Sequence, residues 1–427
     1  MGAEGALSVA GGQGGDVRFK RTLSVIASLL IVSPSLAYAQ DARSVGVAER
    51  PRPEYDPLGR QVGGFRLNAS IDVGAEYSDN VFAEPSGSED EDIYLVVRPD
   101  VRLSSNWSRH ALYVGGRAAF REYNDITSES SVSRGLSAGG RLDIGRDTTL
   151  GLDASTAREI ESRSDPSSVI SLEPIEYDVD GLSVYATHAF SRLFLRIWAS
   201  QSEYDFHNPA GSGFDQNLRD HTNSALGVRA QYALTPTLSL IGQIVSDSRE
   251  YDIVGVSPDS DGVSYMVGAA FEVSRLLRGE VTVGQFERDY EPTPAYPSIG
   301  EVSGTALSGR LSWFVTPLTT VTVTGTRDMQ DSGYESPYLN SAYSARVDHE
   351  LLRNVILTAG VRTATLDFEE IDREDDALTY DVGARYLMNR RVSFDAAYVR
   401  TEVDSSGVSA HRSFEENRLR FGVRVAL

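Results

Sequence analysis

The stretch LNASIDVGAEY, residues 67–77, alternates apolar and polar side chains over its whole length. The apolar positions, from Leu67 to Tyr77, are the odd-numbered residues, and polar residues and one glycine occupy the even-numbered ones. Successive side chains of a β-strand point to opposite faces of the sheet, so this period of two predicts a strand with one apolar and one polar face. The fold must therefore place the apolar face and the polar face of this strand in different environments.

The same alternation recurs along the chain. It predicts about eighteen strands, near residues 66–78, 92–104, 110–122, 133–145, 148–158, 178–190, 192–204, 222–234, 237–250, 262–273, 279–290, 304–315, 319–330, 339–351, 354–367, 377–387, 391–403 and 417–427. The connections are alternately short, as at 146–147 and 235–236, and long, as at 159–177 and 205–221. This order predicts a meander of hairpins whose long loops all lie at one end.

Composition narrows the class of protein. The chain has 427 residues, no cysteine and a formal net charge of −21. A single soluble core of this length is unusual, because cores tend to divide beyond about 250–300 residues. The absence of cysteine excludes a disulfide-stapled scaffold. The acidic charge disfavours nucleic acid as a partner, since nucleic-acid binding needs a basic surface.

The N-terminal region has the pattern of an export signal. Basic residues from Arg18 to Arg21 precede the apolar segment TLSVIASLLIVSPSLAYA, which ends in an A-x-A cleavage pattern at 37–39. We therefore predict a signal peptide over residues 1–39. Residues 40–64 are rich in proline, glycine and charge, and we expect them to form an extended N-terminal arm in the periplasm.

Export and alternation together predict the fold. Strands of about 9–11 residues with unlike faces, tight turns at one end and long loops at the other are typical of outer-membrane barrels. In hydrocarbon every backbone polar group must be paired within the protein, which requires closure. We predict an all-β fold over residues 65–427: a transmembrane antiparallel up-and-down β-barrel of about 18 strands in the bacterial outer membrane, with short periplasmic turns and long extracellular loops. A soluble two-sheet sandwich or β-helix is the alternative, and the arginine and acid on the polar faces favour a wet lumen instead.

Aromatic residues at strand ends predict belts at the two membrane surfaces, because tyrosine and tryptophan rings favour the headgroup level. The alternative is ordinary strand packing, since aromatic residues favour strands in any fold. The predicted belt residues are Tyr77, Tyr123, Tyr204, Tyr251, Tyr290 and Phe368 at the loop ends, and Trp107 and Trp313 at or beside the short turns.

Charged residues that alternate with the apolar positions are predicted to line the pore. Either they orient polar or anionic solutes, or they pair off among themselves, as any wet lumen requires. The predicted lining is Arg98, Asp100, Arg102, Arg117, Arg121, Arg141, Asp143, Arg229, Arg310, Arg346, Arg362, Asp381, Arg385, Arg420 and Arg424, with Asp72, Glu76 and Asp348 as further acids. The long loops 159–177 and 205–221 are the candidates for a constriction.

Catalytic chemistry has little support in the sequence. No G-x-S-x-G, Walker loop or H-E-x-x-H motif is present, and the histidines are scattered. We therefore expect no enzyme activity, no cofactor and no metal site. The pair Asp220 and His221 is the best candidate for the alternative, an outer-membrane hydrolase. The acidic runs 89–92 and 369–376 are expected to be solvated rather than ion-binding.

Two N-terminal motifs carry a family resemblance. The segments RPRPEYDPLGRQVGGF, residues 50–65, and DVGAEYSDNVF, residues 72–82, resemble the signature of the putative beta-barrel porin 2 family. The two motifs cover about thirty residues, and the strand-rich remainder agrees in character. One departure is at Leu427, where outer-membrane barrels usually carry an aromatic that the assembly machinery reads.

The resemblance implies an outer-membrane location and, for many members, a link to surface-polysaccharide export. We expect a porin-like channel for polar solutes or for exopolysaccharide export, and the alternatives are a hydrolase or a structural or adhesive barrel with a plugged lumen. The expected partners are outer-membrane lipid and lipopolysaccharide, the outer-membrane assembly machinery and periplasmic polysaccharide-export components.

Overall fold

The structure, a computed structural model, describes residues 45–427 except 170, 254, 256 and 333–335. The predicted signal peptide and residues 40–44 of the arm lie outside the described residues. No helix within the described ranges is long and apolar enough to cross a membrane. The strands are β1 (Arg60–Val62), β2 (Phe65–Ser78), β3 (Asp92–Ser105), β4 (Ala111–Tyr123), β5 (Ser131–Ile144), β6 (Thr148–Ile160), β7 (Glu176–Ala189), β8 (Leu193–Phe206), β9 (His221–Thr235), β10 (Leu238–Tyr251), β11 (Ser260–Val273), β12 (Leu277–Tyr290), β13 (Glu301–Thr316), β14 (Thr319–Gln330), β15 (Tyr338–Leu352), β16 (Val355–Phe368), β17 (Glu374–Leu387), β18 (Val392–Ser406) and β19 (Phe414–Ala426). Single 3₁₀ turns are η2 (Thr127–Glu129), η3 (Gln216–Arg219) and η4 (Ser274–Leu276).

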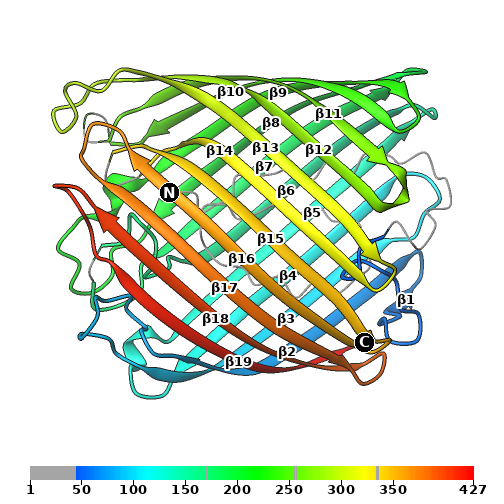
Figure 1. Ribbon diagram of the computed structural model, residues 1–427, viewed down its shortest axis with the longest axis horizontal. Coiled ribbons are helices and arrows are strands. Elements are labelled where there is room, and N and C mark those ends of the chain that lie inside the picture. Colours follow the sequence, from blue (N-terminus) through cyan, green and yellow to red (C-terminus); the bar gives the residue numbers. More distant parts are fainter. Residues whose placement is uncertain (1–44, 170, 254, 256, 333–335) are drawn as a thin grey trace.

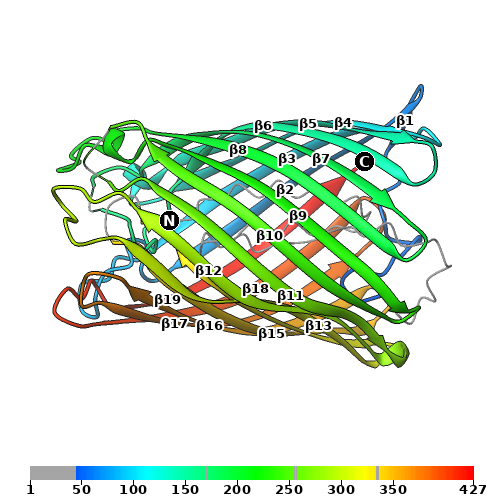
Figure 2. The same ribbon diagram turned by 90° about the horizontal axis from the view of Figure 1, so that it is seen from above.

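Strands β2 to β19 form one closed antiparallel barrel (Figure 1). Each strand pairs with the next along the chain, and the ring closes where β19 pairs with β2, with Arg418 opposite Ser78 and Ala426 opposite Ser70. Figure 2 shows the strands running obliquely around the wall. The prediction of an eighteen-strand meander is confirmed, and each strand begins and ends within three residues of its predicted segment.

The two faces of the wall differ in chemistry. Large apolar side chains lie exposed on the outer face, such as Leu136, Val267 and Phe421, each more than 60% exposed. The alternate residues of the same strands face inward and are mostly polar or charged. Buried apolar clusters among the described residues lie at the loop end, around Tyr177 and around Tyr338. Closure of the backbone ladder, rather than one deep core, therefore holds this chain together.

Strand β1 was not predicted, and it extends the seam of the barrel. β19 ends opposite Ser70, so the first residues of β2 would otherwise be an unpaired edge. β1 pairs with this edge, with Arg60 opposite Leu67. The Gly59 N–H donates to the Leu427 carbonyl over 3.1 Å, so β1 continues in line from β19. Figure 1 shows β1 near the C-terminal end of the chain.

The arm, which the sequence predicted to be extended in the periplasm, also contacts the inner wall. Val47 is fully buried, and its N–H donates to the hydroxyl of Thr320, the second residue of β14 (3.0 Å). The guanidinium of Arg390, in the turn before β18, donates to the Pro53 carbonyl over 2.8 Å. The short-turn mouth is thus partly occupied by the chain's own arm.

Candidate functional site

The lumen wall is the candidate site, and the strand alternation places the predicted lining residues on it. In every strand, all fifteen occupy the positions that alternate with the exposed apolar side chains of the outer face, so their side chains point into the barrel. We call this the inward parity. Arg98, for example, follows Val97 and precedes Pro99 on β3, and Ile93, Leu95 and Val101 of the outer phase are each more than 45% exposed. Their role in a pore remains a prediction.

Many of these charges are paired with neighbours on the same wall. The guanidinium of Arg98 is 2.7 Å from Glu76, and Arg420 lies 3.7 Å from the same carboxylate. Arg420 also lies 3.2 Å from Asp395. A chain of alternating charges therefore runs from β3 through β2 and β19 to β18. This local pairing matches the alternative reading of the lining, because it leaves little field across the lumen.

Further pairs repeat the pattern around the ring. They are Arg117–Glu159 (2.8 Å), Arg141–Asp143 (3.0 Å), Arg229–Glu280 (2.8 Å), Arg346–Asp348 (3.1 Å) and Arg424–Asp72 (3.9 Å). Arg310 pairs with Glu49 of the arm over 3.8 Å. Within the part of the chain that the structure describes, Arg121 and Arg362 form no ion pair.

Three of the predicted belt residues lie on the outside of the barrel. Tyr77 shares the outward parity of Ile71 and Val73, and its hydroxyl donates to Glu91 over 2.5 Å. Trp313 of β13 is about half exposed, and so is Trp107, which lies in the turn that follows β3. Their position at the membrane surface stays a prediction.

The other five belt residues are wrong as lipid-facing rings, because they point into the barrel. Tyr204, Tyr251, Tyr290 and Phe368 are at most 5% exposed, and Tyr123 stacks on the inward Tyr94 with 4.3 Å between ring centroids. Position at a strand end did not determine the face; parity did. Tyr123 has the parity of Arg121, Tyr251 that of Arg249, and Tyr290 that of Arg288. These rings form a collar inside the loop-side mouth.

The loop after β6 extends across this mouth. We call residues 161–169 the crossing loop. The Ser167 hydroxyl hydrogen-bonds the Ser332 hydroxyl over 2.9 Å, and Ser332 lies between β14 and β15. β15 is nine strands from β6 in a ring of eighteen, so this contact joins opposite sides of the barrel. The guanidinium of Arg373, which precedes β17, donates to the Pro166 carbonyl over 3.4 Å.

Buried ion pairs anchor the near side of the crossing loop. Arg163 forms a two-pronged pair with Glu129 of η2, with a shortest distance of 2.5 Å. Glu161 pairs in the same way with Arg219 of η3 over 2.8 and 3.0 Å, and both side chains are at most 5% exposed. The loop 205–221, the other predicted constriction, thus helps to anchor this one.

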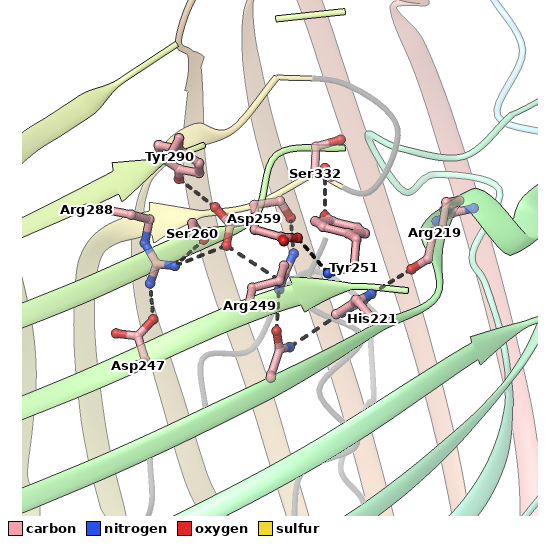
Figure 3. Close-up of polar contacts among 12 residues, drawn as sticks. Arg219, His221, Asp247, Arg249, Tyr251, Asp259, Ser260, Arg288, Tyr290 and Ser332 are labelled. Atoms are coloured by element: carbon pink, nitrogen blue, oxygen red, sulfur yellow. Dashed lines mark hydrogen bonds and ion pairs between the residues drawn. The ribbon is translucent and has the colours of Figure 1, made fainter. Parts of the chain in front are cut away.

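Asp331 anchors the opposite side. It accepts a hydrogen bond from the Tyr290 hydroxyl (2.5 Å) and lies 3.3 Å from Arg288 and 3.5 Å from Arg249. Figure 3 shows the two guanidiniums converging from β10 and β12, beside Tyr251, whose hydroxyl donates to the Ser332 carbonyl over 3.4 Å. Burial would raise the pKa of Asp331, but the two guanidiniums lower it to about 2. The carboxylate therefore stays charged.

The hydrolase candidate does not have a catalytic geometry. Asp220 accepts the Phe206 N–H over 2.6 Å, and burial raises the pKa of this carboxyl to about 6. His221 is 2% exposed, stacks on Tyr204 at 4.7 Å, and bonds the Arg219 carbonyl through Nδ1 over 2.6 Å. Both side chains therefore fix loops. In the described ranges, no group of three or more acidic or histidine side chains is arranged to hold a metal ion.

The acidic runs are only partly solvated. Asp92 is buried and accepts the backbone N–H groups of Asp125 and Ile126 over 3.0 and 2.8 Å. Asp375 is buried against Arg373 at 2.5 Å. These two carboxylates hold loops, while neighbours such as Glu89 and Glu374 are exposed.

The lumen side chains that sequence reasoning missed include a group on β7 and β8. Tyr185, Arg196 and Trp198 all have the inward parity of their strands, out of phase with Val184 and Ile197, which are 43% and 50% exposed. The segment LFLRIWAS conceals the alternation because its inward residues include Phe194 and Trp198. A signal was present in Gly227, which lies opposite Trp198 on β9.

Comparison with solved structures finds proteins of Pseudomonas aeruginosa at low sequence identity. The outer membrane protein opdK from Pseudomonas aeruginosa is 11% identical, with a TM-score of 0.48, and the match covers 84% of this chain and 99% of that one. OccK2 (OpdF) from the same organism is 11% identical, with a TM-score of 0.49 and coverage of 84% and 98%. OpdL, also from Pseudomonas aeruginosa, is 13% identical, with a TM-score of 0.45 and coverage of 86% and 99%.

Among curated proteins none matches this chain. A family model does: the one described as Putative beta-barrel porin 2 matches residues 52–427, which is most of the chain and the whole barrel. The fold, the outer-membrane location and the resemblance of the N-terminal motifs agree with this match. The chain belongs to the putative beta-barrel porin 2 family.

Proposed function

We propose that this porin-family barrel lets small hydrophilic solutes diffuse across the outer membrane. The observation that carries the proposal is the contrast between the two faces of each strand: Arg98, Arg117 and Arg346 point inward from strands whose outward side chains are exposed and apolar. Such an interior favours water, and a ring of eighteen strands is wide enough to enclose an aqueous channel.

Because the lumen charges are paired locally, we expect the channel to admit polar solutes of either charge rather than to select ions of one sign. Arg98, Glu76 and Arg420 satisfy one another within one wall, and similar pairs recur around the ring. Paired charges still offer hydrogen bonds to a passing hydroxyl, but they generate a weaker long-range field than a one-signed lining does.

A barrel closed at its loop side is the second candidate, and the crossing loop favours it. Ser167 and Pro166 bond to loops on the far side of the mouth, so the loop divides the opening. The same contacts disfavour export of a surface polysaccharide, because a polymer needs a continuous wide bore. The proposed channel is therefore one for small solutes that pass beside the loop.

The test is reconstitution of the chain without residues 1–39 in planar bilayers and in liposomes. We expect discrete conductance steps in potassium chloride, and liposome swelling with pentoses and hexoses but not with long oligosaccharides. The variant Arg163→Ala, which releases the Glu129 pair, should raise the conductance. If neither protein conducts, the channel proposal is wrong; if only the variant conducts, the closed barrel is correct.

A further inference from the structure

The short turns form a rim that is rich in arginine. Eight turns connect the strands at this end: 106–110, 145–147, 190–192, 236–237, 274–276, 317–318, 353–354 and 388–391. They contain seven arginines, one each in 106–110, 145–147, 190–192, 274–276 and 353–354 and two in 388–391. Asp147 is the one acidic residue among them, although the whole chain has a net charge of −21. We call these eight turns the turn rim, and it is a positive surface on an acidic protein.

A large apolar side chain accompanies the arginine of each such turn. It lies within two residues of the arginine and is between 48% and 58% exposed: Trp107, Ile144, Phe190, Leu276, Leu352 and Met388. Arginine beside an exposed apolar residue suits the boundary of a membrane, because the guanidinium can stay among the headgroups while its neighbour contacts acyl chains. The turn rim therefore has the composition of a surface that meets lipid.

Three consecutive turns carry arginines without a counter-charge. Arg109, Arg146 and Arg192 are exposed, and none of them forms an ion pair within the described residues. Neighbouring turns of the rim are two strands apart, which is about 10 Å. On the far side of the ring, by contrast, Arg353 pairs with Glu54 of the arm over 3.6 Å. The uncompensated positive charge is therefore on the side of the rim from β3 to β8.

The first two of these turns enclose a hollow of about 520 Å³, whose lining includes Arg109, Arg146 and Asp143. Arg109 donates to the Asp143 carbonyl over 3.2 Å, which holds its guanidinium against the neighbouring turn. The Asp143 carboxylate is already paired, with Arg141 at 3.0 Å and with the His110 N–H at 2.9 Å. Two guanidiniums therefore line one hollow in which the carboxylate has its own partners.

We propose that the turn rim between β3 and β8 binds anionic phospholipid headgroups, with the hollow between Arg109 and Arg146 as the principal site. A guanidinium can donate two parallel hydrogen bonds to a phosphate, which makes arginine well suited to this ligand. The acyl chains would lie against Trp107 and Ile144, which are exposed beside the two arginines. An acidic protein segment would match the charge but not these apolar side chains. The inference does not depend on whether the barrel conducts.

Trp107 allows the lipid contact to be measured, because the chain has only three tryptophans. The double variant Trp198→Phe, Trp313→Phe keeps Trp107 alone. The chain without residues 1–39 is reconstituted in mixed vesicles of phosphatidylglycerol and phosphatidylcholine, with one lipid or the other brominated. Quenching of the Trp107 fluorescence then reports which lipid lies beside it. We expect phosphatidylglycerol to bind there about fivefold or more tightly than phosphatidylcholine.

Glutamine variants test the two arginines in this background. Arg109→Gln, Arg146→Gln should reduce the preference for phosphatidylglycerol to about one. Arg146→Gln alone should reduce it several-fold, and its side chain has no hydrogen bond within the described residues that the change could break. The matched control is Arg121→Gln, Arg362→Gln, which removes the same charge from the inner face and should preserve the preference. Circular dichroism of each variant checks that the barrel is folded.

A second reporter shows whether the effect is local. In a protein that keeps Trp313 alone, on the far side of the ring, Arg109→Gln, Arg146→Gln should leave the quenching unchanged. The proposed site is wrong if Trp107 shows no preference for phosphatidylglycerol, or if the inner-face control loses as much of it as the rim variant does.

Two additions separate lipid from other anions. Inorganic phosphate in place of chloride, at constant ionic strength, should leave the preference unchanged; its loss would mean that the hollow binds the free ion. Soluble polyglutamate should also leave it unchanged, and its loss would mean that the turn rim binds an acidic protein rather than lipid. A preference that survives both additions and disappears in Arg109→Gln, Arg146→Gln supports the lipid site.

Discussion

Arg52 and Glu350 are 298 residues apart in the sequence, yet their side chains form an ion pair 3.0 Å long at the short-turn mouth. Each side chain is at most 5% exposed. Arg52 also donates to the Val47 carbonyl over 2.8 Å, so one guanidinium both folds the arm and attaches it to β15. The arm is therefore part of the barrel's inner surface.

Replacing Arg52 with alanine should release the arm. The change removes the shortest ion pair of the buried Glu350 carboxylate, which keeps Arg50 at 3.5 Å and Arg353 at 3.8 Å. The cost is therefore below the roughly 3–5 kcal/mol of breaking a buried pair that has no other partner. Hydrogen–deuterium exchange of residues 45–57 measures the effect as lost protection. Glu54→Gln is the control, because the pair of Glu54 with Arg353 is about half exposed and worth at most about 1 kcal/mol. Unchanged protection in Arg52→Ala would contradict the docking.

An engineered disulfide should be able to link the crossing loop to the far side of the mouth. The chain has no cysteine, so the double variant Ser167→Cys, Ser332→Cys contains the only possible disulfide. The two hydroxyls are 2.9 Å apart, which is compatible with the short reach of a disulfide after small adjustments. We expect mild oxidation to join the two sites, as detected by mass spectrometry of a digest. The single variant Ser167→Cys should give no intramolecular link, and failure of the double variant to link would place the loop elsewhere.

Acid should detach the loop that contains Asp331. Its pKa is lowered from 3.8 to about 2, so the ion pairs with Arg288 and Arg249 contribute fully above about pH 3.8 and are lost as the pH falls through about 2. Exchange protection around residues 331 and 332 should be the same at neutral pH and at about pH 5, and should fall below about pH 3.

The variant Asp331→Asn separates this carboxylate from others that titrate in the same range. It should reduce the protection at every pH and remove the acid-dependent step. Asp252→Asn, at an exposed loop position, should preserve the step. A wild-type step at the same pH in Asp331→Asn would assign it to another group.

The sequence allowed the strands to be predicted because alternation is a local property. The run from Leu67 to Tyr77 needs no knowledge of its neighbours, and lipid outside with water inside imposes the same pattern on every strand. Parity also placed Arg98 and Arg420 on the inner face. What parity did not give was the partner of each charge, which depends on the register between strands.

Long-range contacts explain what could not be predicted. Nothing local in RPRPEYDPLG indicates that Arg52 would meet Glu350, or that Gly59 would continue the line of β19. The rings of Tyr251 and Tyr290 were assigned to lipid because strand-end aromatics usually belong there. Their parity with Arg249 and Arg288 already pointed inward, and giving parity priority over position would have placed them correctly.

The variant Gly227→Ala tests whether the indole of Trp198 must lie flat on the backbone of β9. Alanine at this position would put a Cβ 2.0 Å from the indole, so the ring must leave the wall or the strands must shift. Overpacking of this kind costs about 1–3 kcal/mol, which we expect as a lower thermal midpoint of unfolding and a change in near-ultraviolet circular dichroism. Gly242→Ala on β10 is the matched control, because a Cβ there meets no atom within 4 Å. Equal thermal midpoints and equal near-ultraviolet spectra for the two alanine variants would show that Gly227 has no role in positioning the indole.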